Sequence, residues 1–257
     1  MIADTLCSSI PLPAMMAMAP EAAAASSFRV SAPSMAVCLP PDVSTKCTPT
    51  HGGVALVEPL LYEPFRYDSL FQKREQHRPS EKRRIGLAAA ELIQEHDTVG
   101  FTAGTTTTQV ARNIRDRRNL RVITNAINIS MELCNCPGLL TFVTGGFVQW
   151  AGSFSLVGQG AINFLSDIYL DKVFISACGV DPLRGVTVIE PEESLTFRAM
   201  IHQAKVRIVV ADSAKLGVVA PALVCPLSDI NILITDARAT DKTIAPFLER
   251  GIEVKRV

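Results

Sequence analysis

A chain of 257 residues is long enough for one large α/β domain or two small domains, and its 25 basic and 25 acidic residues leave a formal net charge of zero. Without an overall positive field, any contact with nucleic acid would need a local basic patch. No apolar run reaches the length of a membrane span, and the amino terminus lacks the basic start of a signal peptide. We therefore expect a cytoplasmic protein without membrane contact.

The seven cysteines form an odd set without the paired spacing of a zinc site. Cys134 and Cys136 are separated by one residue, which is closer than in the usual zinc knuckle. We therefore expect free thiols in a reducing compartment, no metal and no cofactor.

Residues 1–50 differ in composition from the rest of the chain. They contain two basic residues, Arg29 and Lys46, with seven prolines and an alanine run at Ala22–Ala25. No apolar period is sustained, so we expect this segment to be disordered. Residues 51–79 are expected to form a linker, and residues 80–257 the main domain.

A polar and basic stretch runs from Tyr62 to Arg84, with seven basic and four acidic residues. It could form a helix that faces a phosphate, or a solvated linker helix that leads into the domain. Mixed-sign runs usually lie on exposed faces, so the sequence favours the solvated helix.

Regular patterns begin near Pro79. Ser80 is the expected N-cap of an amphipathic helix, because apolar residues from Ile85 to Ile93 follow at helical spacing. Further helical patterns then alternate with seven short β-rich runs. These runs are Thr98–Phe101, Leu120–Ile123, Leu139–Val143, Lys172–Ser176, Val206–Ala211, Ile230–Ile234 and Ile252–Val254. Such alternation predicts an α/β fold, with a mainly parallel sheet and helices on both of its faces.

The first strand is followed by the small, hydroxyl-rich loop Gly104-Thr105-Thr106-Thr107. Glycine lets the backbone approach a ligand, and the next helix offers free N–H groups beside the threonine hydroxyls. The loop could therefore hold a phosphate. A threonine-rich helix cap is an equally good interpretation, because the stretch matches neither the Walker nor the dinucleotide-binding glycine pattern.

Two further strand ends carry polar or glycine residues, namely Thr124-Asn125 and Gly145-Gly146. Each could be only a cap or a turn. Ligands of parallel sheets bind where strands end, so three such ends in succession favour one shared pocket.

Two charged residues later in the chain are further candidates. Glu193 lies in the expected first turn of a helix, where an acidic residue ordinarily serves only the helix dipole. Lys215 follows an apolar strand in "ADSAKLG" and could hold a phosphate, although most loop lysines are simply solvated.

In this order the motifs resemble the effector-sensing domain of DeoR-type bacterial transcription regulators. The resemblance covers about residues 51–257 and is carried by collinear segments. These include "THGGVAL" (50–56), "SEKRRIGLAA" (80–89), "AGTTTTQVA" (103–111), "VITNAINIS" (122–130), "VTGG" (143–146), "DKVFISACGVD" (171–181) and "ADSAKLG" (211–217). It implies a fold similar to ribose-5-phosphate isomerase and coenzyme A transferases.

The resemblance also implies a pocket for a phosphorylated sugar or a related metabolite. Residues Gly104 to Thr107 would form the loop that binds the phosphate. Thr124 and Asn125 would form a second wall of the pocket, and Gly145 and Gly146 would let the backbone approach the ligand closely. Glu193 and Lys215 would line the polar end, and the protein would be a homo-oligomer. Thr102 departs from the family, which commonly has an aspartate there that contacts a sugar hydroxyl.

A second departure lies upstream of "THGGVAL". The family places a DNA-binding winged helix-turn-helix there, but Pro33–Pro49 has four prolines and one basic residue. We therefore expect no sequence-specific DNA binding from this segment. The first functional hypothesis is a transcription regulator, repressor-like, that senses a sugar phosphate. The alternatives are a sugar-phosphate isomerase with Glu193 as its base, and a partner protein that does not bind DNA.

Overall fold

The computed structural model describes residues 47–50, 53–56, 71–149 and 153–257. The chain divides into two compact units, residues 1–59 and residues 60–257. In the first unit, strand β1 (Cys47–Thr50) pairs antiparallel with β2 (Gly53–Leu56). Most of the segment for which we predict disorder and no helix-turn-helix lies outside the described residues.

The second unit is built on a seven-stranded sheet with the order β14-β13-β11-β8-β3-β4-β5, in which every neighbouring pair is parallel. The strands are β3 (Thr98–Phe101), β4 (Leu120–Thr124), β5 (Leu139–Val143), β8 (Leu170–Ile175), β11 (Ala204–Val210), β13 (Ile232–Thr235) and β14 (Glu253–Arg256). The predicted α/β fold with a mainly parallel sheet is confirmed.

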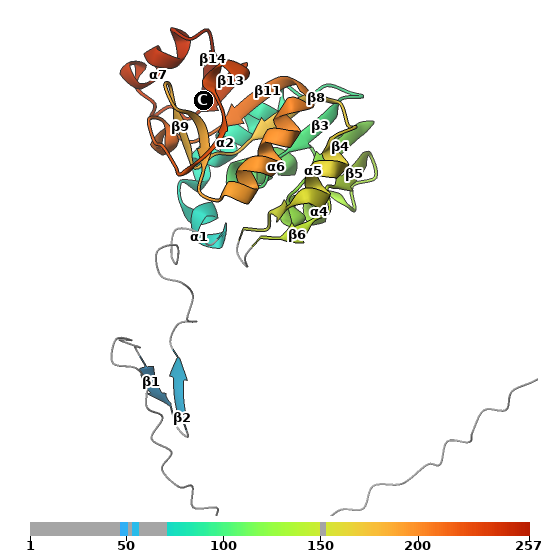
Figure 1. Ribbon diagram of the computed structural model, residues 1–257, viewed down its shortest axis with the longest axis vertical. Coiled ribbons are helices and arrows are strands. Elements are labelled where there is room, and N and C mark those ends of the chain that lie inside the picture. Colours follow the sequence, from blue (N-terminus) through green and yellow to red (C-terminus); the bar gives the residue numbers. More distant parts are fainter. Residues whose placement is uncertain (1–46, 51–52, 57–70, 150–152) are drawn as a thin grey trace, which may run out of the picture. The chain divides into compact units, whose positions relative to one another are not determined.

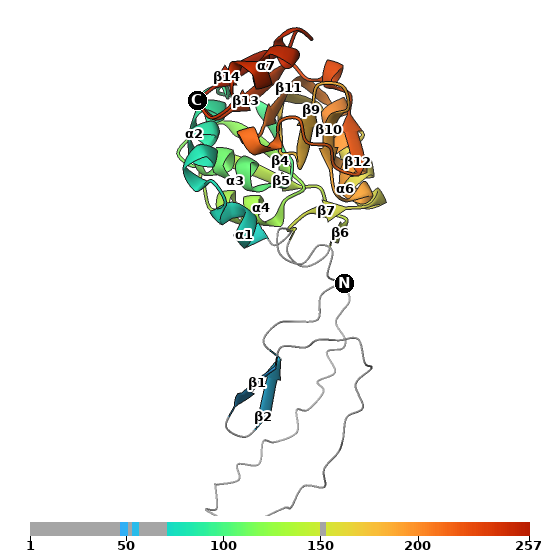
Figure 2. The ribbon, with the colours of Figure 1, turned by 90° about the vertical axis from the view of Figure 1, so that its left-hand side faces the viewer.

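Helices cover both faces of this sheet (Figures 1 and 2). On one face α2 (Pro79–Ala90) packs on α3 (Thr105–Arg112), with α4 (Ile127–Leu133) beside α3. On the other face α6 (Pro191–His202) packs on β8 and β11, beside α5 (Gln159–Leu165). The short α1 (Phe71–Gln76) contacts α3, and α7 (Asp241–Leu248) contacts β14. Among the described residues, no helix is long and apolar enough to cross a membrane.

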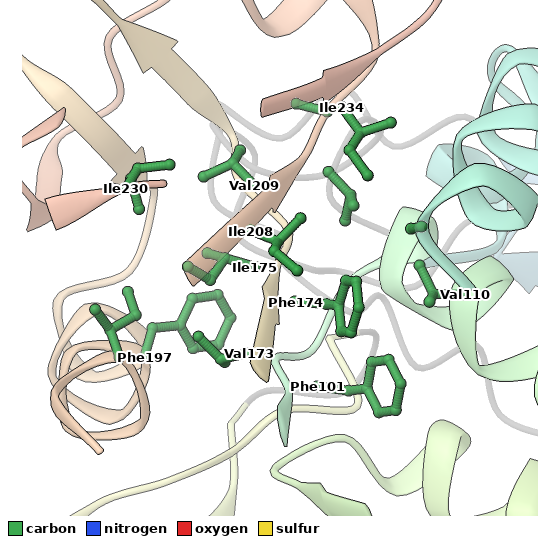
Figure 3. Packing of buried hydrophobic residues seen from close by; sticks show 14 of the residues in the cluster. Phe101, Val110, Val173, Phe174, Ile175, Phe197, Ile208, Val209, Ile230 and Ile234 are labelled. Carbon is green, nitrogen blue, oxygen red and sulfur yellow. The ribbon is translucent and has the colours of Figure 1, made fainter. Parts of the chain in front are cut away.

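The core is formed where the central strands meet the two helical layers. Phe101 of β3 and Phe174 of β8 are paired in register, and their rings stack with centroids 5.4 Å apart. Figure 3 shows Val110 of α3 on the side of these rings, whereas Phe197 of α6 lies across the strand beside Val173. Alternate strand residues point to opposite faces, so the central strands contribute apolar side chains to both layers.

Two small antiparallel sheets were not predicted from the sequence. One has the order β12-β10-β9 and comprises β9 (Gly179–Asp181), β10 (Gly185–Val188) and β12 (Ala222–Cys225). The other pairs β6 (Phe147–Val148) with β7 (Leu156–Val157). The short 3₁₀ helices η2 (Ser213–Lys215) and η3 (Leu227–Asp229) complete the unit.

The prediction that Ser80 caps the helix is wrong. Helix α2 begins at Pro79, and Arg78 occupies the cap position in the left-handed conformation with φ of 53°. Proline is suited to the first helical position because its fixed φ is helical. The backbone N–H that proline lacks would have no hydrogen-bond partner within the helix at this position. Ser80 lies within the first turn, where its hydroxyl donates to Glu81 Oε2 at 2.7 Å.

Candidate functional site

A cavity of about 560 Å³ lies where α1, α2 and the start of α3 meet the carboxyl ends of β8 and β11. The residues that line it are Lys73, Arg74, His77, Lys82, Thr105, Thr106, Ser176, Ala177, Cys178, Ile189, Ala211, Asp212, Lys215, Val218, Ala220 and Pro221. Its volume falls in the range of small-molecule sites, and its position is the one expected for a ligand of a parallel sheet.

The threonine loop divides into two pairs of side chains. The hydroxyls of Thr107 and Thr108 donate to the carbonyl of Gly104 at 2.9 and 2.7 Å. Thr105 and Thr106 instead line the cavity. Backbone N–H groups in the first turn of a helix have no intrahelical partner and attract anions. Thr105 and Thr106 therefore bring hydroxyl and amide donors to the same wall.

Gly104 is required by a close approach between two strand ends. A Cβ added at Gly104 would overlap the side chain of Ser176, which follows β8 and lines the cavity. Ser176 is held in place because its amide donates to Thr102 Oγ1 at 3.0 Å. Thr102 is fully buried and ties β3 to β8.

Basic side chains gather on the wall formed by α1 and α2. Lys73, Arg74 and His77 come from α1 and the turn after it, and Lys82 comes from the first turns of α2. Only 4% of Lys82 is exposed, and its Nζ donates to the carbonyl of Arg74. The predicted solvated linker helix is therefore wrong for Lys82, because the folded chain turns this part of the basic stretch toward the cavity.

The charge of Lys82 is costly in this position. Burial lowers the pKa of Lys82 to about 8, Asp212 acts against this shift, and the nearby cations Lys215 and Arg74 reinforce it. A buried ammonium beside like charges is stabilised by any anion that enters. The cavity wall is thus suited to a ligand that carries negative charge.

The opposite wall is formed by the "ADSAKLG" segment after β11. Asp212 is buried, accepts a hydrogen bond from the amide of Ala214 at 3.1 Å and lies 3.5 Å from Arg78 Nη1. These contacts hold η2 so that Lys215 lines the cavity. Asp212 is the one acidic residue in a lining that also holds five basic residues.

Thr124 and Asn125 are buried in hydrogen bonds within the protein. Thr124 Oγ1 donates to the carbonyl of Phe101 at 2.8 Å. Asn125 Oδ1 accepts from the amide of Ala103 at 2.9 Å, and its Nδ2 donates to Ser155 Oγ at 3.0 Å. Neither residue lines the cavity. Their contacts fix the backbone before the threonine loop, and a direct role in ligand binding stays a prediction.

Gly145 and Gly146 form the turn between β5 and β6, with φ of 71° and 98°. These left-handed values favour glycine. A Cβ at Gly146 would also overlap the carbonyl of Val157, so the close approach at this glycine is to β7. The two glycines do not line the cavity, and their contact with a ligand also stays a prediction.

Glu193 lies in the first turn of α6 and is partly buried. Burial raises the pKa of Glu193 to about 7, whereas the positive charge of Arg74 and a hydrogen bond from Ser155 act in the opposite direction. Its charge also raises the pKa of Cys178, after the larger effect of burial. Glu193 is thus electrostatically coupled to two cavity residues without lining the cavity itself.

Of the predicted site residues, the structure brings Thr105, Thr106 and Lys215 together in the cavity lining, with Gly104 and Thr107 directly behind the two threonines. Sequence reasoning missed Arg74 and Lys82 as site residues. Their signal in the sequence is the basic stretch Tyr62–Arg84, one interpretation of which is a helix that faces a phosphate. No cluster of potential metal ligands occurs in the described part of the chain, and Cys134, Cys136, Cys178 and Cys225 are free thiols.

A parallel α/β unit with a cavity at its strand ends has the architecture of a small-molecule-binding domain. Among protein families, the model of the DeoR C-terminal sensor domain matches residues 77–237. The chain is 35% identical over 203 residues to an uncharacterized HTH-type transcriptional regulator of Haemophilus influenzae, covering 79% of this chain and 77% of the relative. This chain belongs to the DeoR family of transcription regulators.

Other relatives carry regulatory names. The HTH-type transcriptional repressor GlcR of Bacillus subtilis is 34% identical over 175 residues, which cover 68% of this chain and 66% of GlcR. Transcriptional repressor AccR of Agrobacterium fabrum is 32% identical over 190 residues, which cover 73% of this chain and 71% of AccR. The first functional hypothesis, a DeoR-type regulator with a sensor domain, is thereby confirmed, and the isomerase alternative is not supported.

Solved structures show a distant likeness in fold. A probable sor operon regulator from Shigella flexneri has a TM-score of 0.42 and 13% identity, covering 66% of this chain and 90% of that one. Ribose 5-phosphate isomerase from Plasmodium falciparum has a TM-score of 0.38 and 14% identity, covering 53% and 52%.

Proposed function

We propose that the cavity binds a phosphorylated sugar or a similar phosphorylated metabolite, and that its occupancy is the signal which this regulator senses. The observation that carries the proposal is the convergence of Lys82, Lys215 and the amino terminus of α3 on one cavity. Lys82 is buried there although burial opposes its charge. A phosphate dianion supplies the charge and acceptor oxygens that these donors lack.

The rest of the cavity is suited to the sugar part of such a ligand. Ser176 and Thr105 offer hydroxyl groups, and Ile189 and Val218 add apolar surface. A polar ligand in a partly apolar site is held by a few well-placed hydrogen bonds. A volume of about 560 Å³ leaves room for the sugar beside its phosphate.

The proposal extends to the whole regulator. We infer that the protein works in the cytoplasm, where phosphorylated sugars and DNA are both available, and that it forms a homo-oligomer, as regulators that read two half-sites do. Light scattering at several protein concentrations tests the oligomer. Because the segment upstream of residue 50 lacks the composition of a winged helix-turn-helix, we expect no sequence-specific DNA binding from it, and most of this segment lies outside the described residues.

The test is a thermal-shift panel of sugar phosphates and their unphosphorylated parents, measured on the full chain and on Lys215→Met. A ligand at 100 times its Kd adds about 2.7 kcal/mol to stability. We expect stabilisation by phosphorylated members only, and a selective loss of that effect in Lys215→Met. The matched control is Lys205→Met, which removes an exposed lysine of β11. Equal loss for phosphorylated and parent sugars would show that Lys215 serves only the structure.

A further inference from the structure

Helix α1 is a short element held by a few discrete contacts. It comprises six residues, too few to form a stable helix in isolation. Phe71 is buried and packs edge to face on Phe154, with ring centroids 5.2 Å apart. At the other end of the helix, Glu75 pairs with Arg112 of α3 at 2.6 Å. The position of α1 therefore depends on these contacts and on what lies beneath it.

Beneath α1 lies the cationic cavity. Lys73, Arg74 and His77 contribute to the lining, facing the same space as Lys82 and Lys215. Arg74 and Lys215 act against the charge on Lys82, whereas Asp212 and Glu75 favour it, and Arg74 also interacts with the carboxylate of Glu193. The cavity lining nevertheless holds five basic residues against one acidic residue, so docked α1 adds positive charge to it, and an anion in the cavity would offset that charge.

One donor on α1 lacks a partner in this arrangement. Arg74 Nε is buried and makes no hydrogen bond within the described part of the chain. A buried donor without an acceptor is unfavourable, and a ligand oxygen would satisfy it. The docked position of α1 thus carries two unmet requirements, for negative charge and for an acceptor, and one anion meets both.

We propose that α1 is an anion-dependent strap, which docks over the cavity when an anion is bound and is released when the cavity is empty. This inference rests on the proposed function and adds how the bound state differs from the empty one. Among the described residues, α1 is the first helix of the sensor unit along the chain. A ligand that binds only the docked state shifts the equilibrium toward it.

The experiment is hydrogen–deuterium exchange on the full chain with inorganic phosphate as the probe, against chloride at the same ionic strength. Saturating phosphate should slow exchange in residues 71–78 by about fivefold or more, the low end of common coupling effects. Amides of α7 should not change. Trypsin cleavage after Lys73 and Arg74 should slow in parallel.

A variant pair isolates the strap. Phe71→Ala removes the apolar anchor without changing any charge, so α1 should exchange faster without phosphate and the Kd for phosphate should rise about fivefold. Gln72→Ala, an exposed neighbour on the same helix, should behave as the wild type. Unchanged exchange in α7 would show that the Phe71→Ala domain is folded.

The outcomes separate the two proposals. If phosphate raises the melting temperature but leaves exchange in residues 71–78 unchanged, the strap is wrong and the proposed function stands. If neither phosphate nor any sugar phosphate stabilises the domain, both are overturned. Slower exchange at α1 with equal effects of Phe71→Ala and Gln72→Ala would also contradict the strap, because the anchor would then play no part.

Discussion

Arg78 Nη1 donates a hydrogen bond to Ser213 Oγ at 2.8 Å, across 135 residues of sequence. Ser213 in turn donates through its amide and its hydroxyl to Asp236, at 2.6 and 3.1 Å. Burial alone would raise the pKa of Asp236, but these bonds and the amide of Arg238 lower it. The turn between α1 and α2 is thereby fastened to the segments that follow β11 and β13, and the segment after β11 lines the cavity through Asp212 and Lys215.

Replacing Arg78 should therefore affect stability and binding together. Arg78→Met removes the ion pair between Arg78 and buried Asp212, and it removes the hydrogen bond that Arg78 donates to Ser213 Oγ. The free energy of unfolding should therefore fall by about 1–3 kcal/mol. Urea denaturation measures the loss. Arg84→Met, at an exposed position of α2, is the control and should change stability by less than about 0.5 kcal/mol. Similar values for the two variants would mean that the Arg78 contacts contribute little.

Lys82 predicts a pH dependence with opposite signs for binding and stability. The pKa of Lys82 is lowered to about 8, so its charge is lost above that pH, and phosphate affinity should fall by up to about tenfold per pH unit. The unfolded chain keeps this proton until the pH approaches 10.5, the ordinary pKa of a lysine. Between these two values the unfolded state binds more protons, so the contribution of Lys82 to the stability of the empty domain should rise with pH.

Calorimetric titration and urea melts between pH 7 and 9.5 check both trends. Lys82→Met should bind phosphate weakly at every pH. In this variant the rise in stability with pH that Lys82 causes should be absent. Arg83→Met, which changes the exposed neighbour, should retain both trends. A phosphate affinity in Lys82→Met that still falls through pH 8 would assign the titration to another group.

The two pairs of threonines should respond differently to mutation. Thr105→Ala with Thr106→Ala removes hydroxyls that line the cavity, and should weaken phosphate binding by roughly 1.5–3 kcal/mol for each charge-assisted bond while the fold survives. Thr107→Ala with Thr108→Ala removes the bonds to the Gly104 carbonyl, and should reduce stability by about 1 kcal/mol each. If the Thr105/Thr106 double variant loses more stability than the Thr107/Thr108 double variant, the assignment of the first pair to binding and of the second pair to structure is wrong.

Gly104 and Ser176 should be energetically coupled. Gly104→Ala places a Cβ against Ser176, and should cost about 1–3 kcal/mol of stability. The added Ser176→Gly change removes the obstructing side chain and should recover part of that loss. A double-mutant cycle in urea measures the interaction, expected at about 0.5–3 kcal/mol for residues in contact. Additive effects would show that the strain at Gly104 arises elsewhere.

The sequence by itself determined the architecture of the sheet. Short β-rich runs such as Lys172–Ser176, in which Val173, Phe174 and Ile175 are buried, alternate with amphipathic helical patterns, and the ends of all seven predicted strands agree with the structure to within two residues. These patterns are local, because burial on both faces of a parallel strand requires a continuous apolar run. The threonine loop was likewise visible, since a strand followed by glycine and a helix start forms the loop from neighbouring residues.

Only the tertiary structure decided which polar residues share the cavity. Thr124 and Asn125 resemble Thr105 and Thr106 as strand-end residues, yet their side chains are used in internal hydrogen bonds. Lys82 lies in a run with the composition of an exposed helix, yet it is buried, and its pKa depends in part on Asp212 and Lys215, which come much later in the chain. The periodicity of the sequence indicates which face of a helix or strand is apolar. Whether charged side chains from α1, α2 and the segment after β11 come together in one cavity depends on how these elements pack.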